Sequence, residues 1–244
     1  MKKVAIVFQT HNLEEFAVKN FRLLKEKLPH NYDLFLSVDV DHYKAIEYMD
    51  AYSASSVIPV SRHDTLLQQT LGKHDLCLWH QAHTPLLNMF SRAKKEYDYY
   101  YLIENDLYAD NWTVVFNELE NVDDDFIGSN FLQHPDNEFR FEGGRVDTDT
   151  AWIWWPSIDH LPWRTKLGVY GPFQRYSRSA VEALMPTAPM WGFWEAFIPT
   201  FLFEHKFSMT DCRSLWAEKK LTSAIYHDKT VQSRLGSNDP FFLF

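Results

Sequence analysis

The stretch Val4-Ala5-Ile6-Val7-Phe8 decides the fold of this chain. A continuous apolar run rich in β-branched residues is typical of a strand that is buried on both faces of a sheet. Runs of the same kind follow at 34–38 and 56–60, and the stretches 13–28 and 43–51 between them have the apolar spacing of helices. This order predicts a parallel sheet with right-handed crossovers, and therefore an α/β fold.

The alternation of helices and strands continues to about residue 130. We expect a helix that begins at Thr84, a strand at 99–103 and a further strand within 125–130. Asn12 and Asp110 have the short polar side chains of helix N-caps, so we expect each of them to begin the helix that follows it.

The second half of the chain has a different pattern. Residues 131–176 are rich in Pro, Gly, Trp and Arg and lack periodicity, which predicts long ordered loops with an edge hairpin at 151–155. A short helix capped by Ser177 or Ser179 should follow, and the apolar stretch 193–207 is helix-like despite an internal proline.

Length and charge limit the class of protein. The 244 residues contain no linker or repeat, which favours a single domain over 1–244 with a mostly parallel central sheet. Lys+Arg 24 against Asp+Glu 33 gives a net charge of −9, and there is no basic run. This balance argues against nucleic acid and against anionic membranes as partners.

Cysteine usage and apolar run lengths indicate the compartment. Cys77 and Cys212 are the only cysteines, too few for a disulfide framework or a Cys-rich zinc site. The apolar run at 4–8 is shorter than a signal-peptide core, and no run approaches the length of a membrane span. We therefore expect a soluble cytoplasmic protein without a transmembrane segment.

Glycine is scarce, and this excludes two nucleotide-binding devices. The 8 glycines form neither G-x-G-x-x-G nor G-x-x-x-x-G-K-[ST], so a glycine cradle for phosphates is not expected. The strand at 99–103 instead runs into Glu104-Asn105-Asp106. Carboxylates at the carboxyl end of a strand can hold Mg²⁺ or Mn²⁺ together with substrate phosphates. The alternative is a solvated turn, because acid-x-acid triplets are frequent in this acidic chain.

The arrangement resembles a GT-A fold glycosyltransferase. In that superfamily an Asn, a few residues later an Ala, and then a strand often precede the metal motif. Here Asn88 and Ala93 precede the strand that ends in Glu104-Asn105-Asp106, with Glu104 in place of the usual first Asp. The resemblance implies a single Rossmann-like domain, with a nucleotide-sugar and metal-binding half at 1–130 and an acceptor-binding half at 131–244.

The resemblance also implies a donor and a metal. The donor would be a nucleotide-diphosphate sugar, such as a UDP- or GDP-sugar, and the cofactor Mn²⁺ or Mg²⁺. The nucleotide contacts implied are Thr10, Asn12, Asp39, Asn88 and Glu104. Asp106, Glu104 and His227 are the implied metal ligands, and for His227 the alternative is a histidine satisfied by an ordinary hydrogen bond.

Trp191-Gly192-Phe193-Trp194-Glu195 is similar to segments that border the acceptor site in such enzymes. Glu195 is the candidate general base for the acceptor hydroxyl, or a group that binds acceptor hydroxyls. Its alternative is a helix N-terminal Glu that is favoured by the helix dipole.

Tryptophans concentrate in the same half and suit sugar rings, because indole offers apolar area and one N–H donor. The predicted acceptor-binding residues are Trp154, Trp155, Trp191, Trp194 and Arg178. An aromatic core is the alternative for each tryptophan, and a solvated surface position is the alternative for Arg178.

The sequence thus favours a metal-dependent glycosyltransferase, hexosyltransferase-like, that transfers sugar to a carbohydrate or glycoconjugate acceptor, as in polysaccharide biosynthesis. Retention or inversion of the anomeric centre stays open. One alternative is a non-catalytic carbohydrate-binding or degenerate transferase-fold protein. Another is a metal-dependent hydrolase built on Asp75, His80 and His83.

Overall fold

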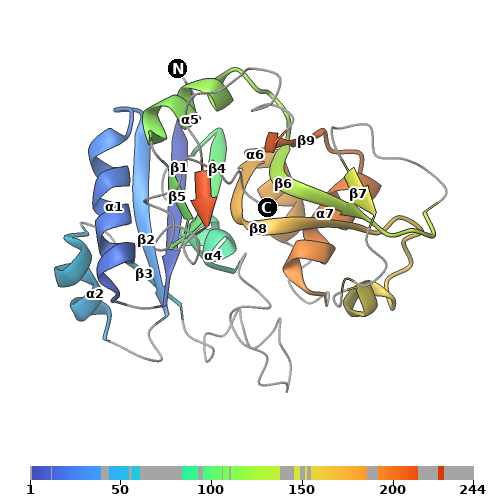
Figure 1. Ribbon diagram of the computed structural model, residues 1–244, viewed down its shortest axis with the longest axis horizontal. Helices are drawn as coiled ribbons and strands as arrows, with labels where there is room; N and C mark the ends of the chain where they lie inside the picture. Colours follow the sequence, from blue (N-terminus) through green and yellow to red (C-terminus); the bar gives the residue numbers. More distant parts are fainter. Residues whose placement is uncertain are drawn as a thin grey trace, which may run out of the picture.

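A computed structural model gives the architecture (Figure 1). It describes residues 2–11, 13–39, 44–54, 57–60, 84–92, 96–105, 107–109, 111–137, 146–148, 152, 155–185, 192–213 and 225–227.

The molecule is built on a mixed eight-stranded sheet with the order β3-β2-β1-β4-β8-β6-β7, in which β9 also pairs with β6. Its strands are β1 (Val4–Thr10), β2 (Tyr32–Asp39), β3 (Val57–Val60), β4 (Tyr99–Glu104), β6 (Phe126–Gln133), β7 (Val146–Thr148), β8 (Leu167–Ser177) and β9 (Met209–Asp211). A second sheet pairs β5 (Leu107–Ala109) with β10 (Ile225–His227).

The first four strands are parallel, as the apolar runs predicted. β1 pairs with β2 on one side and with β4 on the other, and β2 pairs with β3. Because these four strands are parallel, their carboxyl ends all meet at one edge of the sheet, which we call the carboxyl edge. The α/β fold with a mostly parallel sheet is therefore confirmed.

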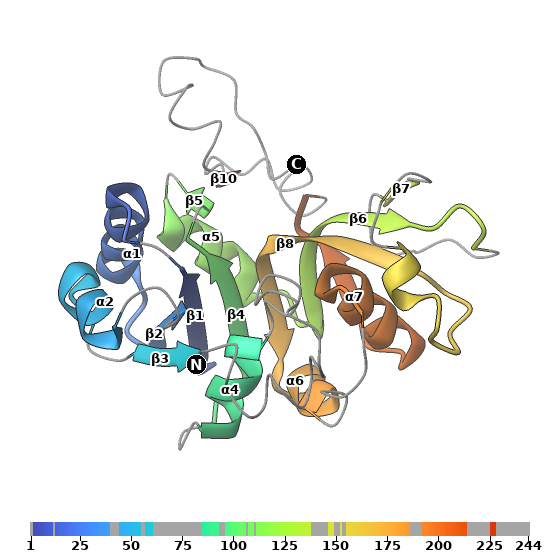
Figure 2. The same cartoon turned by 90° about the horizontal axis from the view of Figure 1, so that it is seen from below.

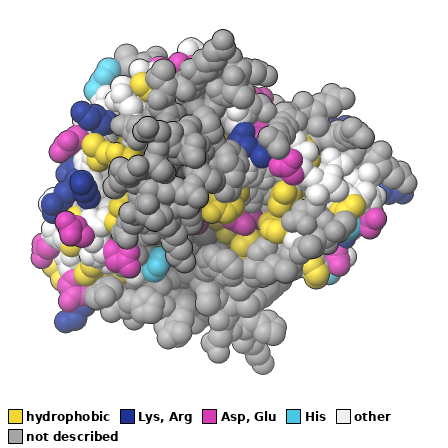
Figure 3. Space-filling view, in the orientation of Figure 1, with side chains coloured by type: hydrophobic (Ala, Val, Ile, Leu, Met, Phe, Trp, Pro, Cys, Tyr) yellow, Lys and Arg dark blue, Asp and Glu magenta, His cyan; other side chains and the backbone are white. Residues whose placement is uncertain are grey.

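Helices cover both faces of the sheet (Figure 2). They are α1 (Glu15–Lys27), α2 (Ala45–Tyr52), α4 (Thr84–Arg92), α5 (Trp112–Glu120), α6 (Arg178–Leu184) and α7 (Trp194–Glu204). One core lies between the sheet and α1, α2 and α5, and the other lies between the sheet and α4, α6 and α7. Acidic and basic side chains are interspersed over the side formed by α1 and α2 (Figure 3).

Two helix starts differ from the sequence expectation. The helix α1 begins at Glu15 rather than directly after Asn12, and its N-cap Glu14 makes no side-chain cap hydrogen bond. The helix α5 is capped by Asn111, whose Oδ1 accepts hydrogen bonds from the backbone N–H groups of Thr113 and Val114, and not by Asp110. Asp110 and Asn111 both have side chains that can cap a helix, and the residue at which α5 begins decides which of them does.

The strand β8 is the largest difference, because its residues were expected to form loops. It lies in the middle of the sheet, antiparallel to β4 and β6. Gly168, Gly171 and Pro172 are poor strand formers, but ten of the eleven residues of β8 are buried. Tertiary burial, not local propensity, therefore makes this strand. In the predicted hairpin at 151–155, Trp155 instead begins a short 3-10 helix, η2 (Trp155–Ile158).

In the described part of the chain no helix is long and apolar enough to cross a bilayer.

Candidate active site at the carboxyl edge

The predicted donor residues follow the strands that end at the carboxyl edge. Thr10 ends β1, Asp39 ends β2 and Glu104 ends β4. The register pairs Gln9 with Glu104 and Thr10 with Val38, so the three strands end at the same level. For Asp39 and Asn88 the structure describes the backbone, and Asn12 lies outside the described residues.

Thr10 places its side chain inside the protein. The residue is 1% exposed, and its hydroxyl lies 3.0 Å from the hydroxyl of Tyr52 in α2. Burial raises the pKa of Tyr52 to about 12, so its phenol stays neutral beside Thr10. Any contact of Thr10 with a ligand therefore falls to its backbone, as long as this side-chain pair persists.

A row of polar side chains crosses three strands at this edge. Ser37, Gln9 and Glu104 are register partners on β2, β1 and β4, and partners in parallel strands share a face. Ser37 Oγ and Gln9 Oε1 are buried without a hydrogen-bond partner among the described residues. Buried polar atoms without partners are rare in proteins and often mark a site for water or a ligand. The sequence reasoning identified Glu104 but missed Gln9 and Ser37.

The second sheet brings the end of the chain to the same place. In the antiparallel pair of β5 and β10, His227 is the register partner of Leu107, and Tyr226 is the partner of Tyr108. Leu107 directly follows Asp106 in the sequence. The pairing therefore places the backbone of His227 beside the metal motif, where the resemblance implied a ligand.

The donor types at this edge fit a divalent cation of the Mn²⁺ or Mg²⁺ class. Carboxylate oxygen suits both ions, and imidazole nitrogen is compatible with Mn²⁺. Within the described residues no cluster of three His, Cys, Asp or Glu side chains forms a metal site. Asp106 lies outside these residues, as does the side chain of His227.

Glu195 lies on the other side of β4, at the start of α7. Its Oε1 accepts a hydrogen bond of 2.7 Å from the backbone N–H of Gly171 in β8. Phe173, two residues further along β8, pairs with Ile103, the residue before Glu104. The carboxyl group of Glu195 therefore lies near the carboxyl end of β4. Its partial burial raises its pKa to about 8, and the bond from Gly171 opposes this shift.

Two predicted acceptor tryptophans prove to be core residues. Trp155 is 4% exposed and Trp194 is 1% exposed, and both belong to the core beneath α7. The indole of Trp194 packs on Gly171, and that of Trp155 meets Trp152 edge to face. Neither ring offers a free face to a sugar in this structure, and the burial of both agrees with the alternative of an aromatic core. Trp154 and Trp191 lie outside the described residues.

Arg178 lies at the opposite edge of the sheet. Its backbone N–H donates to Asp98 O, just before β4, and its guanidinium pairs with Glu96 and Glu182 at 2.9 Å. The six residues of β4 span about 17 Å between the two edges. The predicted acceptor role of Arg178 therefore does not fit its position.

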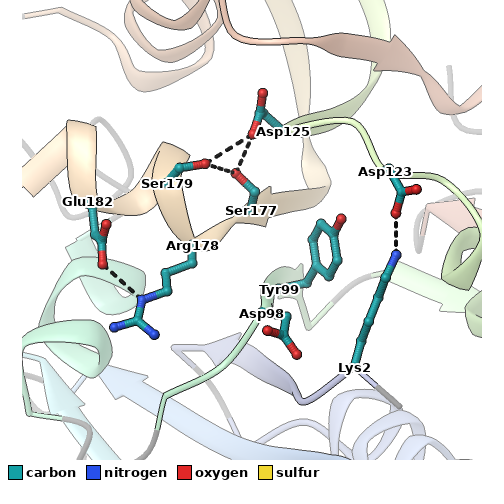
Figure 4. A pocket seen from close by; sticks show the side chains of 9 residues that line it. All are labelled: Lys2, Asp98, Tyr99, Asp123, Asp125, Ser177, Arg178, Ser179 and Glu182. Atoms are coloured by element: carbon teal, nitrogen blue, oxygen red, sulfur yellow. Dashed lines mark hydrogen bonds and ion pairs between the residues drawn. The ribbon is translucent and has the colours of Figure 1, made fainter.

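Arg178 lines a polar cavity of about 580 Å³ at this edge, where the parallel strands begin and which we call the amino edge (Figure 4). Its polar groups are paired with one another: Lys2 bonds to Asp123, and Asp125 accepts hydrogen bonds from Ser177 and Ser179. These bonds join the starts of β1 and β6 to the end of β8, which gives the cavity lining a structural role.

The hydrolase alternative rested on Asp75, His80 and His83, which lie outside the described residues. Gly171 is the third residue of the site that sequence reasoning missed, after Gln9 and Ser37. A glycine in a stretch without periodicity gave no signal that its N–H would hold a carboxylate.

Comparison with known proteins adds the fold class. The mannosyltransferase PcManGT from Pyrobaculum calidifontis, solved with GDP-Man and Mn²⁺, matches with a TM-score of 0.50 and 7% identity, covering 86% of this chain and 54% of that one. HddC from Yersinia pseudotuberculosis matches with a TM-score of 0.46 and 12% identity, covering 86% and 89%. TarS from S. aureus gives 0.39 and 11%, covering 74% and 48%.

No family model and no curated protein sequence matches the chain. This chain spans about half the length of PcManGT and of TarS. At these identities the likeness concerns the fold. Taken with the strand order, it shows that the chain has a GT-A-like fold, the α/β fold of nucleotide-diphospho-sugar transferases.

Proposed function

We propose that this protein is a metal-dependent glycosyltransferase that moves a sugar from a nucleotide-diphosphate sugar to a carbohydrate or glycoconjugate acceptor. The observation that carries the proposal is the pairing of β10 with β5, which brings His227 to the residue after Asp106. If Glu104-Asn105-Asp106 were only a turn, we would not expect a histidine from a distant segment to lie beside it.

In this proposal Asp106, Glu104 and His227 hold Mn²⁺ or Mg²⁺. When bound, the cation would stabilise the negative charge that develops on the leaving diphosphate. The net charge of −9 supports this arrangement, because an acidic chain without a basic cluster needs a cation to hold a diphosphate. The Mn²⁺ and GDP-Man in PcManGT, which has the same fold, agree with it.

Glu195 is the proposed base. Oε1 is held by Gly171, and Oε2 accepts no hydrogen bond within the described residues. As the acceptor oxygen bonds to the anomeric carbon, its proton passes to Glu195, and the bond from that carbon to the diphosphate breaks with its electron pair on the diphosphate. A direct displacement of this kind inverts the anomeric centre.

The test is release of nucleoside diphosphate from a panel of UDP- and GDP-sugars, with Mn²⁺, Mg²⁺ or EDTA, in the presence of mixed carbohydrate acceptors. We expect metal-dependent release with at least one donor, and loss of that release in Asp106→Ala with an unchanged melting temperature. Full activity of Asp106→Ala would refute the metal assignment. Binding of sugars without turnover of any donor would favour the carbohydrate-binding alternative.

A further inference from the structure

Gly171 lies where β8 departs from the regular ladder. Between β6 and β8 the register shifts, because Ile127 pairs with Arg175 whereas Ser129 pairs with Tyr170. The irregular segment of β8 therefore includes Gly171. Its backbone N–H donates a hydrogen bond to Glu195 Oε1. The irregular segment of β8 therefore binds a carboxyl group.

The space around Gly171 permits only glycine. A Cβ at this position would overlap two groups at once, Glu195 Oε1 and the indole of Trp194, with Trp194 Cη2 at 2.6 Å. Gly171 has no left-handed φ, so its backbone would accept another residue and the side chain alone is excluded. The two groups that exclude a side chain are neighbours at the start of α7.

The start of α7 is itself fixed. The N-cap Phe193 donates its backbone N–H to Ser157 Oγ in η2 at 3.0 Å, and its carbonyl accepts from Ala196 and Phe197. Trp194 is buried against β8, so the first turn of the helix cannot rotate without losing this contact. Glu195 therefore leaves the helix in one direction, toward Gly171.

From this geometry we propose that Gly171 is the positioning residue of Glu195: its missing side chain admits the carboxyl group, and its N–H fixes Oε1 and leaves Oε2 for the acceptor hydroxyl. This inference rests on the proposed function in assigning the acceptor hydroxyl to Oε2. The seat itself, a carboxyl held by a glycine N–H, does not depend on it.

Nothing charged in the described structure near this seat competes for Glu195. On β8, the guanidinium of Arg175 is bound to the carbonyls of Leu119 and Asp124, and Tyr176 donates its hydroxyl to Gln174. Tyr170 packs against the other core, and η2 carries no titratable side chain. The protonation of Glu195 therefore reports its own burial and the Gly171 bond.

The experiment compares Gly171→Ala with Gly168→Ala. Gly168 is on the same strand, and a Cβ there would also meet an indole, that of Trp152, at 2.5 Å, but it does not touch Glu195. The primary measurement is the titration of the Glu195 carboxyl carbon by NMR, with Glu195→Gln to assign the signal. It needs no substrate, so it separates failure of this inference from failure of the proposed function.

In Gly171→Ala the carboxyl must move toward water. Because burial is the larger cause of its raised pKa, we expect that pKa to fall by at least one unit toward the usual 4.5. With an active donor, kcat should fall at least tenfold with little change in the donor KM, and Gly171→Ala/Glu195→Gln should be no slower than Glu195→Gln. Gly168→Ala should lower the melting temperature and leave the titration unchanged.

An unchanged titration in Gly171→Ala, or equal shifts in both glycine variants, would overturn the inference. If Gly171→Ala fails to fold, Glu195→Asp tests the same contact, because the shorter side chain withdraws the carboxyl from the Gly171 N–H while the glycine stays. An aspartate that titrates like Glu195, with unchanged kcat, would also overturn it.

Discussion

Leu107 and His227 are register partners, although they come from the middle and the last part of the chain. Because Leu107 directly follows Asp106 in the sequence, backbone pairing holds the backbone of His227 opposite the residue after Asp106. If the proposed function holds, this ladder would support the metal site through the backbone.

Removal of the imidazole should weaken metal use without unfolding the protein. We expect His227→Ala to need at least roughly 10–100-fold more Mn²⁺ for half-maximal turnover, because that range is typical for residues that only support a metal ligand and a direct ligand should matter no less. The measurement is a Mn²⁺ titration of activity. His160→Ala, which changes an exposed histidine, is the control. Identical titrations for both variants would remove His227 from the site.

Glu195 makes both stability and activity depend on pH. Its pKa of about 8 in the folded protein exceeds the 4.5 of the free group, so between these values the folded state holds a proton that the unfolded state has released. Stability from this group is therefore lost as pH rises toward 8, and Glu195→Gln should be more stable than the natural protein at pH 9 by on the order of 2 kcal/mol.

Urea unfolding at pH 5 and pH 9 measures this difference, which should vanish at the lower pH. Turnover by the natural protein should rise up to about pH 8, because the base must be ionised. A Glu195→Gln variant that retains full turnover at pH 8.5 would exclude the base role.

Arg175 is a buried cation with a structural role. It is 1% exposed, donates to the carbonyls of Leu119 and Asp124 at 2.7 and 2.9 Å, and lies over the ring of Tyr99. Because Leu119 is in the last turn of α5, the charge also opposes the negative end of that helix.

Arg175→Met leaves both carbonyls without their donor and should cost about 2 kcal/mol of unfolding free energy in urea titrations. Activity per folded molecule should be unchanged. A stability loss under 0.5 kcal/mol would mean that water replaces the guanidinium at no cost.

Arg178→Ala should leave kcat and KM unchanged, because Arg178 lies at the amino edge of the sheet. Its two ion pairs are exposed, and exposed pairs contribute less than about 1 kcal/mol. Steady-state kinetics and a melting curve measure both quantities. A raised acceptor KM would restore the acceptor role that the sequence suggested.

The hydroxyl groups of Ser177 and Ser37 should contribute differently to the free energy of unfolding. Ser177 caps α6 by accepting the N–H of Ala180, so Ser177→Ala should cost about 1 kcal/mol. Ser37 Oγ is buried without a partner among the described residues, so Ser37→Ala should be neutral or stabilising. Parallel urea titrations compare them, and an equal cost would show that Ser37 has a partner, such as a bound water.

The parts of the fold that follow from periodicity were predictable. The runs at 4–8, 34–38 and 99–103 became β1, β2 and β4, and the helix α6 is capped by Ser177 as expected. The strand β8 was not predictable, because its glycines and proline argue against a strand and only burial between β4 and β6 makes it one. Local propensity gives no information about such tertiary effects.

The candidate site, like the fold, could be predicted from the sequence only in part. The position of Glu104 follows from its place after an apolar run, and the place of Glu195 in the first turn of α7 was within reach of the sequence. That Trp155 and Trp194 are core residues was not, because an indole suits a sugar and a core equally well. The seat at Gly171 depends on a contact between two elements and has no local signature.

Because the sheet of β5 and β10 is small, the proposed activity should be lost at a lower temperature than the fold. β10 pairs with β5 through three residues, and an isolated two-stranded ladder is marginal in water. Such a ladder opens with far less free energy than the eight-stranded sheet. Catalysis should therefore fail on heating before circular dichroism records any loss of secondary structure, and a melting temperature would overstate the useful thermal range of this protein.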